Sequence, residues 1–125
     1  MAMLNLANSS ILAPHFRFYA ISSIPVPEPF TVPVPSNWLN KTLTMEIKTV
    51  NTTHYSFSAG PASSNAPLKV FACAPGSIVS WGFTGTLLGV YATSNGGNGT
   101  QPAYVSNWNY LGWGQVREGW NGPVV

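Results

Sequence analysis

Acidic side chains, which hydrolytic enzymes use as proton donors, bases and nucleophiles, are scarce in this chain. Its 125 residues include no Asp and only three Glu residues: Glu28, Glu46 and Glu118. Hydrolysis of a glycosidic bond generally needs two carboxyl groups, one on either side of that bond. Glu28 lies in a proline-rich stretch, Glu46 on the polar side of an expected strand and Glu118 in the C-terminal tail. We therefore expect three solvated surface charges, no catalytic residues and no enzymatic activity of the chain by itself.

The two histidines and the single cysteine are the remaining groups that could act as bases, ligands or nucleophiles. His15 and His54 flank expected strands, and no Asp is present to orient either ring, so we expect surface or hydrogen-bonding roles. Cys73 is interpreted as a small buried residue of a strand, with a reactive thiol as the alternative. Two histidines without a cluster of Cys or Asp do not make a metal site, so we expect neither a metal nor a cofactor.

Aromatic residues near the C-terminus offer a different kind of chemistry. Tyr104, Trp108 and Tyr110 occupy even-numbered positions of one segment, and Trp113 follows them. Tyr and Trp rings can stack on the faces of sugars, because they combine an apolar face with a polar group. These four residues are the candidates for carbohydrate stacking, although core or interface packing is the interpretation that we favour for them.

Four Asn-x-Ser/Thr sequons, which begin at Asn8, Asn40, Asn51 and Asn98, are candidates for N-glycosylation. Chance predicts about two, given 11 Asn and 23 Ser or Thr among 125 residues. The excess favours a secretory origin. The N-terminus favours the opposite, because it has neither a basic region nor a long apolar run and does not resemble a signal peptide.

Charge and hydropathy exclude two classes of partner. Charged residues make up 6% of the chain, and the five basic residues that give a net charge of +2 are spread along it; soluble domains average about 25%. Nucleic-acid binding requires clustered Lys and Arg side chains. No apolar run approaches the roughly 18–20 residues of a membrane span. We therefore expect no nucleic-acid partner and no membrane partner.

The composition predicts short strands joined by many turns, because Gly, Pro, Ser and Thr are abundant and no helical periodicity of useful length appears. The proline-rich residues 25–35 are expected to form a loop or an extended edge segment. The expected strands span residues 15–21, 42–50, 54–59, 69–74, 77–81, 86–93 and 103–111. The pattern indicates an all-β fold, an antiparallel β-sandwich or jelly roll.

Residues 42–59 contain the clearest pattern of the chain. Leu43, Met45 and Ile47 should share one face of a strand, with Thr44, Glu46 and Lys48 on the other. The turn 51–53 then leads into a second strand with Tyr55 and Phe57 facing inward. Further along, residues 86–93 are nearly all apolar, which predicts a strand buried on both faces.

Two segments of the chain carry a family resemblance. Residues 50–62 read VNTTHYSFSAGPA, and residues 79–115 read VSWGFTGTLLGVYATSNGGNGTQPAYVSNWNYLGWGQ. They resemble the C-terminal concanavalin A-like domain (β-xylosidase C-terminal type) of fungal family 43 glycoside hydrolases, the β-xylosidases and α-arabinofuranosidases. The block FTG-x-x-x-GVYAT-SNG, followed by PAY-x-S-x-W-x-Y, is the most specific part. HFRFYAIS and VPVPSNWLNKTL also resemble that domain, so the likeness covers roughly residues 5–115.

The resemblance implies an accessory role on hemicellulose of the xylan or arabinan type. In that family the sandwich follows a catalytic β-propeller that carries the acidic residues, packs against it and stabilises it. No propeller is present here, so no catalytic residue carries over. We expect residues 1–115 to be a partial concanavalin A-like sandwich, truncated at its N-terminus, with a connector at 25–35 and an irregular tail at 116–125. The parent family is extracellular.

Three interpretations stay open. The chain is an accessory domain without activity by itself, an independent glycan-binding module that uses its Trp and Tyr rings, or a fragment of a longer gene. The implied partners are the catalytic propeller of a parent hydrolase and plant cell-wall polysaccharide. A sandwich cut within one sheet would expose strand edges and apolar faces, which predicts marginal stability or self-association.

Overall fold

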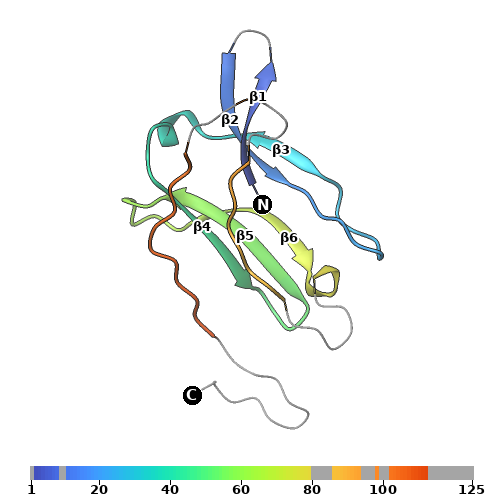
Figure 1. Ribbon diagram of the computed structural model, residues 1–125. Helices are drawn as coiled ribbons and strands as arrows, with labels where there is room; N and C mark the ends of the chain where they lie inside the picture. Colours follow the sequence, from blue (N-terminus) through green and yellow to red (C-terminus); the bar gives the residue numbers. More distant parts are fainter. Residues whose placement is uncertain (1, 9–10, 80–85, 94–97, 99–101, 113–125) are drawn as a thin grey trace. The chain divides into compact units, whose positions relative to one another are not determined.

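The computed structural model describes residues 2–8, 11–79, 86–93, 98 and 102–112, with side chains from residue 14 onward. The chain divides into two units, residues 1–85 and residues 86–125. The first unit contains two antiparallel three-stranded sheets (Figure 1). The expected all-β class is therefore confirmed, and the arrangement is that of a small β-sandwich.

The first sheet has the order β1-β2-β3. Strand β1 spans Ala2–Asn8, β2 spans Ile11–Phe18 and β3 spans Phe30–Pro33. The predicted strand at 15–21 was therefore misplaced at both ends, and β1 was not predicted. The bounds follow from pairing: β2 starts opposite Asn8 of β1 and ends where Phe18 meets Phe30 of β3. Residues 19–21 lie beyond the last paired position.

The second sheet has the order β4-β5-β6 and contains the predicted hairpin. Strand β4 spans Leu43–Thr49, β5 spans His54–Pro61 and β6 spans Lys69–Pro75. The turn between β4 and β5 lies where it was predicted. The pairing of β4 with β5 runs without interruption, whereas that of β5 with β6 shifts register between Phe57 and Ser58.

The core of the first unit consists of two clusters that join the sheets. Phe16 of β2 is fully buried and packs with Ala59 of β5, and Phe18 packs with Ala72 and Ala74 of β6. Because alternate residues of β2 point to the same face, the buried positions 16 and 18 are separated by the exposed Arg17. This alternation directs Phe16 and Phe18 toward the second sheet.

Aromatic rings from the two sheets contact one another in the core. The centroids of Phe16 and Phe71 are 4.6 Å apart, and those of Phe18 and Phe57 are 5.3 Å apart. Trp38, at the end of the short 3-10 helix η1 (Ser36–Trp38), meets Phe16 edge to face at 6.3 Å. Ring pairs at these separations add to the burial of apolar area. The inward orientation predicted for Phe57 is thus confirmed.

The proline-rich residues 25–35 form a loop and the short edge strand β3, in agreement with the sequence. The prediction for Cys73 was wrong, because its side chain is exposed. Ala72 and Ala74 on either side of it point into the core, so the strand's alternation turns Cys73 to the opposite face.

The strand predicted at 77–81 was also wrong for its described part, since the 3-10 helix η2 occupies Gly76–Ile78. Its closing bond runs from Val79 N–H to Gly76 O at 3.1 Å, and Gly76 N–H donates to Thr53 O at 2.7 Å. These two bonds fix a tight turn directly after β6, and residues 80–81 lie outside the described part.

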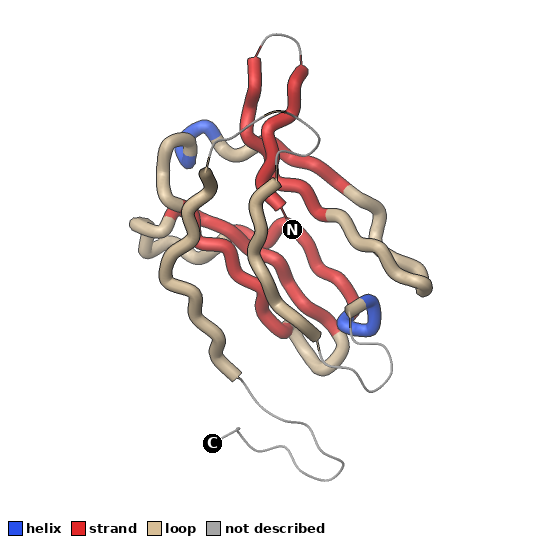
Figure 2. Tube along the Cα trace, viewed as in Figure 1, coloured by secondary structure: helices blue, strands red, loops and turns tan. Residues whose placement is uncertain are grey.

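Residues 86–93 and 102–112 of the second unit form no strand in their described positions (Figure 2). The predicted strands at 86–93 and 103–111 are therefore not observed, and the expected burial of 86–93 on both faces was wrong. A continuous apolar run fixes neither a register nor a partner, so it indicates a strand only weakly. Residues 116–125 lie outside the described residues.

No helix in the described part of the chain is long and apolar enough to cross a membrane.

Candidate functional site

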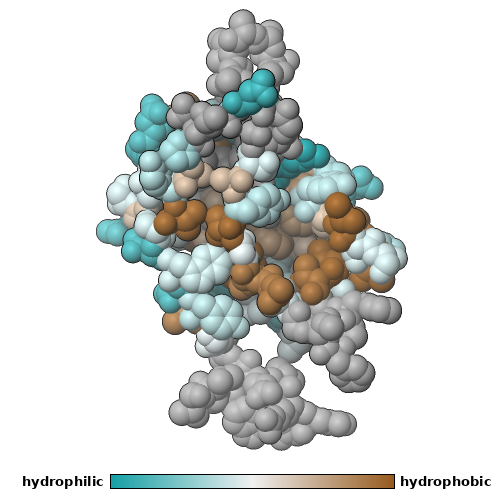
Figure 3. All heavy atoms as spheres, in the orientation of Figure 1, coloured by the Kyte–Doolittle hydropathy of each residue, from teal (hydrophilic) through white to brown (hydrophobic). Residues whose placement is uncertain are grey.

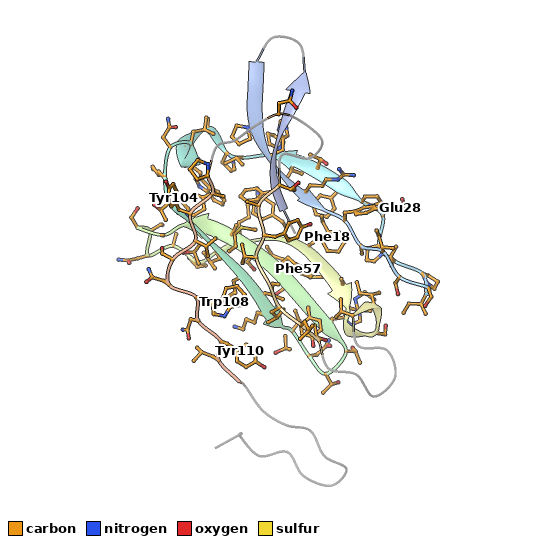
Figure 4. All side chains as sticks on the ribbon, in the orientation of Figure 1. Phe18, Glu28, Phe57, Tyr104, Trp108 and Tyr110 are labelled. Carbon is orange, nitrogen blue, oxygen red and sulfur yellow. The ribbon has the colours of Figure 1, made fainter. Side chains whose placement is uncertain are left out.

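The aromatic candidates of the second unit are exposed. The side chains of Tyr104, Trp108 and Tyr110 are 90%, 59% and 73% exposed, and they are spaced along their segment rather than gathered around one hollow (Figure 4). Asn107 has a φ of 55°, in the left-handed region, which interrupts the alternation expected of a strand. Trp113 lies outside the described residues. Exposed rings of this kind can stack on a sugar or pack against another protein.

The carboxylates do not gather into a catalytic pair among the described residues. Glu28 is exposed in the loop between β2 and β3 (Figure 4), and Glu46 is exposed on β4. Neither lines the two hollows of the first unit that are described below. Glu118 lies outside the described part. No group of three His, Cys, Asp or Glu side chains that could hold a metal occurs among the described residues.

One hollow, of about 430 Å³, lies at the turn between β4 and β5, where the side chain of Asn51 organises a hydrogen-bond network. Asn51 Oδ1 accepts from Thr53 N–H at 2.8 Å, from His54 N–H at 2.9 Å and from Thr53 Oγ1 at 2.9 Å. Bonds from an Asn side chain to the backbone two and three residues on are typical of turns. The network therefore fixes the hairpin turn that the sequence predicted.

His54 borders the same hollow but does not form an activated nucleophile with its neighbour. Its Nδ1 lies 2.8 Å from Thr53 Oγ1. A hydroxyl has one proton to donate, and Thr53 donates it to Asn51 Oδ1, so His54 Nδ1–H must be the donor in this contact. A ring nitrogen that carries the proton cannot remove one from Thr53. The contact gives His54 a hydrogen-bonding role within the turn.

Asn51 is the sequon residue whose side-chain hydrogen bonds the structure defines. Asn51 Nδ2 makes no hydrogen bond within the described part of the chain, because the contacts of the side chain go through Oδ1. Asn40 is exposed with a φ of 59°. The side chain of Asn8, and the two residues that follow Asn98, lie outside the described residues.

We predict that Asn51 is glycosylated when the chain passes through a eukaryotic secretory pathway, because its turn bonds span only three residues and leave Nδ2 accessible. Peptide mass spectrometry after treatment with an N-glycosidase should show nearly complete conversion at this position. Thr53→Ala should abolish the modification, and Thr53→Ser should retain it. An unmodified Asn51 in a secreted chain that carries a glycan at Asn40 would contradict this prediction.

A second hollow, of about 450 Å³, contains a residue that the sequence reasoning did not select. Trp38 lines it together with polar neighbours that include Asn37, Lys41 and Ser63. The Trp38 ring is half-buried and is held edge to face by Phe16 and Phe71. A fixed aromatic ring beside a few polar groups can bind a small polar ligand such as a saccharide. The only sequence signal was a Trp that follows the proline-rich connector.

A scan against protein-family models, a search of curated proteins and a search of solved structures each returned no match. The likeness to family 43 accessory domains therefore rests on the segments at 50–62 and 79–115.

Proposed function

We propose that the chain is a non-catalytic β-sandwich module of a family 43 glycoside hydrolase acting on xylan- or arabinan-type hemicellulose, where it packs against the catalytic β-propeller and supports it. Two packed antiparallel sheets agree with the fold class that the sequence resemblance implies. We also propose that the strands connect as in a concanavalin A-like jelly roll and that the parent enzyme is extracellular.

The observation that carries the proposal is the exposure of large apolar side chains within the segment that bears the resemblance. Leu87 and Tyr91 are 97% and 85% exposed, and Tyr104 and Leu111 are 90% and 81% exposed. Large apolar side chains are visible at the surface of the described residues (Figure 3). Extensive exposed apolar surface usually marks an interface. A module that packs against another domain would cover such side chains.

A binding experiment tests this proposal. The chain is mixed with the catalytic propeller of a fungal family 43 β-xylosidase from which the C-terminal domain has been removed. We expect the two to co-elute from a sizing column, and the propeller's Tm to rise by several degrees because binding stabilises the folded state. Leu87→Asp with Tyr104→Asp should abolish the complex, whereas Ser64→Asp in an exposed loop should not. Separate elution at high concentrations, or hydrolysis of an aryl xyloside by the chain alone, would contradict the proposal.

The alternative function is an independent carbohydrate-binding module, favoured by the Trp38 hollow and by the exposed rings of the second unit. Retention on insoluble arabinoxylan distinguishes the two functions, because the accessory role predicts none. If the chain is retained, Asn37→Ala tests the hollow without removing a core side chain, and Trp108→Ala tests the exposed rings. Retention that either substitution removes would replace the first proposal with the second.

A further inference from the structure

Strand β4 is the least protected of the described edge strands for which side chains are known. β3, β4 and β6 each lie at the end of a sheet. β3 has four residues and ends at Pro33; β6 ends at Pro75 and carries the register shift. Short length, proline and irregular pairing all discourage a further strand from adding to an edge. β4 has seven residues, no proline and regular pairing with β5.

The hydrogen bonds of β4 show which backbone groups face its open edge. At one end Val50 N–H donates to His54 O, and at the other Ala62 N–H donates to Thr42 O, each at 2.9 Å. In an antiparallel ladder every second residue bonds to the neighbouring strand. Because the register between these two bonds is unbroken, the even-numbered residues face β5. The residues with backbone groups directed to the open edge are Leu43, Met45, Ile47 and Thr49.

The side chains of β4 separate into an apolar row and a charged pair. Ile47 lies opposite Phe57 of β5 and so shares the face that packs on the first sheet. Even so, Ile47 is 51% exposed and Met45 is 47% exposed. Glu46 and Lys48 are exposed on the opposite face, two residues apart. An added strand would therefore find backbone groups that pair with no other described strand, together with apolar side chains and two opposite charges.

We infer that β4 is a docking edge for a second copy of this chain, paired antiparallel about a two-fold axis at Ile47. In that register Ile47 meets Ile47 of the second copy, and Met45 meets Thr49, all of them residues with outward-facing backbone groups. Glu46 of each copy lies opposite Lys48 of the other. The interface is isologous, as in most dimers, and it continues the sheet from one copy into the next.

The charges select this register over its neighbours. A parallel arrangement through the same edge would turn the second copy over, so its Glu46 and Lys48 would lie on the opposite face of the joined sheet and no pair of opposite charges would form. A shift of the antiparallel axis by two residues, to Met45, would place Glu46 opposite Thr44. With the two-fold axis at Ile47, two Glu46–Lys48 pairs form between the copies. In the same register, the residues whose backbone groups face the open edge lie opposite one another. Neither argument depends on the proposed function in hemicellulose degradation.

Sedimentation velocity of the full chain over a wide range of concentrations tests the inference. The dimer fraction should rise with concentration. Larger species should not appear at higher concentrations, because the pairing occupies the β4 edge of each of the two copies. Glu46→Lys, or Lys48→Glu, should raise the dimer Kd by about 10-fold or more, because each places like charges opposite one another. Glu28→Lys changes the net charge by as much as Glu46→Lys but lies in a loop, so it should leave the Kd unchanged.

Mixing the two β4 variants is the most specific test of the charge pairing. Glu46→Lys chains carry two basic residues on β4 and Lys48→Glu chains carry two acidic residues, so a heterodimer restores both opposite-charge pairs. The mixture should associate within a few-fold of the unaltered chain, with each variant alone much weaker. A monomer at every concentration, equal effects of Glu28→Lys and Glu46→Lys, or a mixture no stronger than its components would overturn the inference. Unchanged far-UV circular dichroism of the variants excludes misfolding as the cause.

Discussion

Replacement of Phe16 by Ala should destabilise the first unit by about 3–5 kcal/mol, the usual cost of deleting a buried aromatic ring. Phe16 is fully buried, and its ring contacts both Phe71 and Trp38. An alanine side chain at this position is too short to keep either contact. Small domains have a total free energy of unfolding of about 5–15 kcal/mol, so the variant should lose much of its stability. Urea unfolding followed by far-UV circular dichroism measures the change.

Two further variants make this experiment specific. Phe16→Leu retains most of the buried volume and should cost less than Phe16→Ala. Ile21→Ala removes a side chain that is 81% exposed and should change the stability by no more than about 0.5 kcal/mol. Equal effects of Phe16→Ala and Ile21→Ala would show that Phe16 does not join the two sheets in solution.

The hairpin of β4 and β5 could be predicted because local signals agree there. Period-two alternation defines β4, and Asn51 provides the side-chain bonds that a turn needs. Strand β1 gave no such signal, because Ala and Asn have little preference for strands and its position depends on pairing with β2. Strand ends are set by partners distant in sequence, which one-dimensional patterns do not show.

Burial in the central strand β5 also departs from what residue type indicates. Ser56 and Ser58 are polar and alternate with Tyr55 and Phe57, a pattern typical of an outward face, yet both are buried. The hydroxyl of Ser56 donates to Lys48 O at 3.3 Å, so one of these polar groups is satisfied within the sheet. A central strand has a neighbour on each side, and small side chains on it are covered by longer ones on those neighbours.

The candidate sites were predicted in part. The exposed aromatic residues of the second unit were selected by spacing alone, whereas Trp38 and the hollow beside it arise from the meeting of η1 with the end of β5. Such a hollow brings together Asn37 and Ser63, which are far apart in the sequence. Only the folded structure places these residues together.

Replacement of Ala59 by Asp should unfold most of the first unit at neutral pH. Ala59 is fully buried in β5 and packs in the cluster that contains Phe16 and Val34. An ionised carboxylate buried without a partner costs several kcal/mol, because it loses its hydration. The nearest basic side chain is that of Lys69, directly opposite Ala59 on β6; it is exposed, with its Nζ 5.3 Å from the centroid of the Phe71 ring, so pairing with the new carboxylate would offset only part of this cost. Ala62→Asp, at an exposed position just beyond β5, introduces the same group and should have little effect.

The pH dependence of the free energy of unfolding of Ala59→Asp distinguishes the effect of the buried charge from the effect of the larger side chain. Burial raises the pKa of the new carboxyl above its unfolded value of about 3.9, because the charged form is disfavoured. The penalty is therefore largest above the folded pKa, where the unfolded chain ionises freely, and it shrinks as the pH falls toward the unfolded pKa. Relative to Ala59→Asn, the Asp variant should regain stability in acid, as measured by urea unfolding at pH values on both sides of that range. Equal stabilities of the two variants at every pH would mean that residue 59 is hydrated and that the sheets do not enclose it.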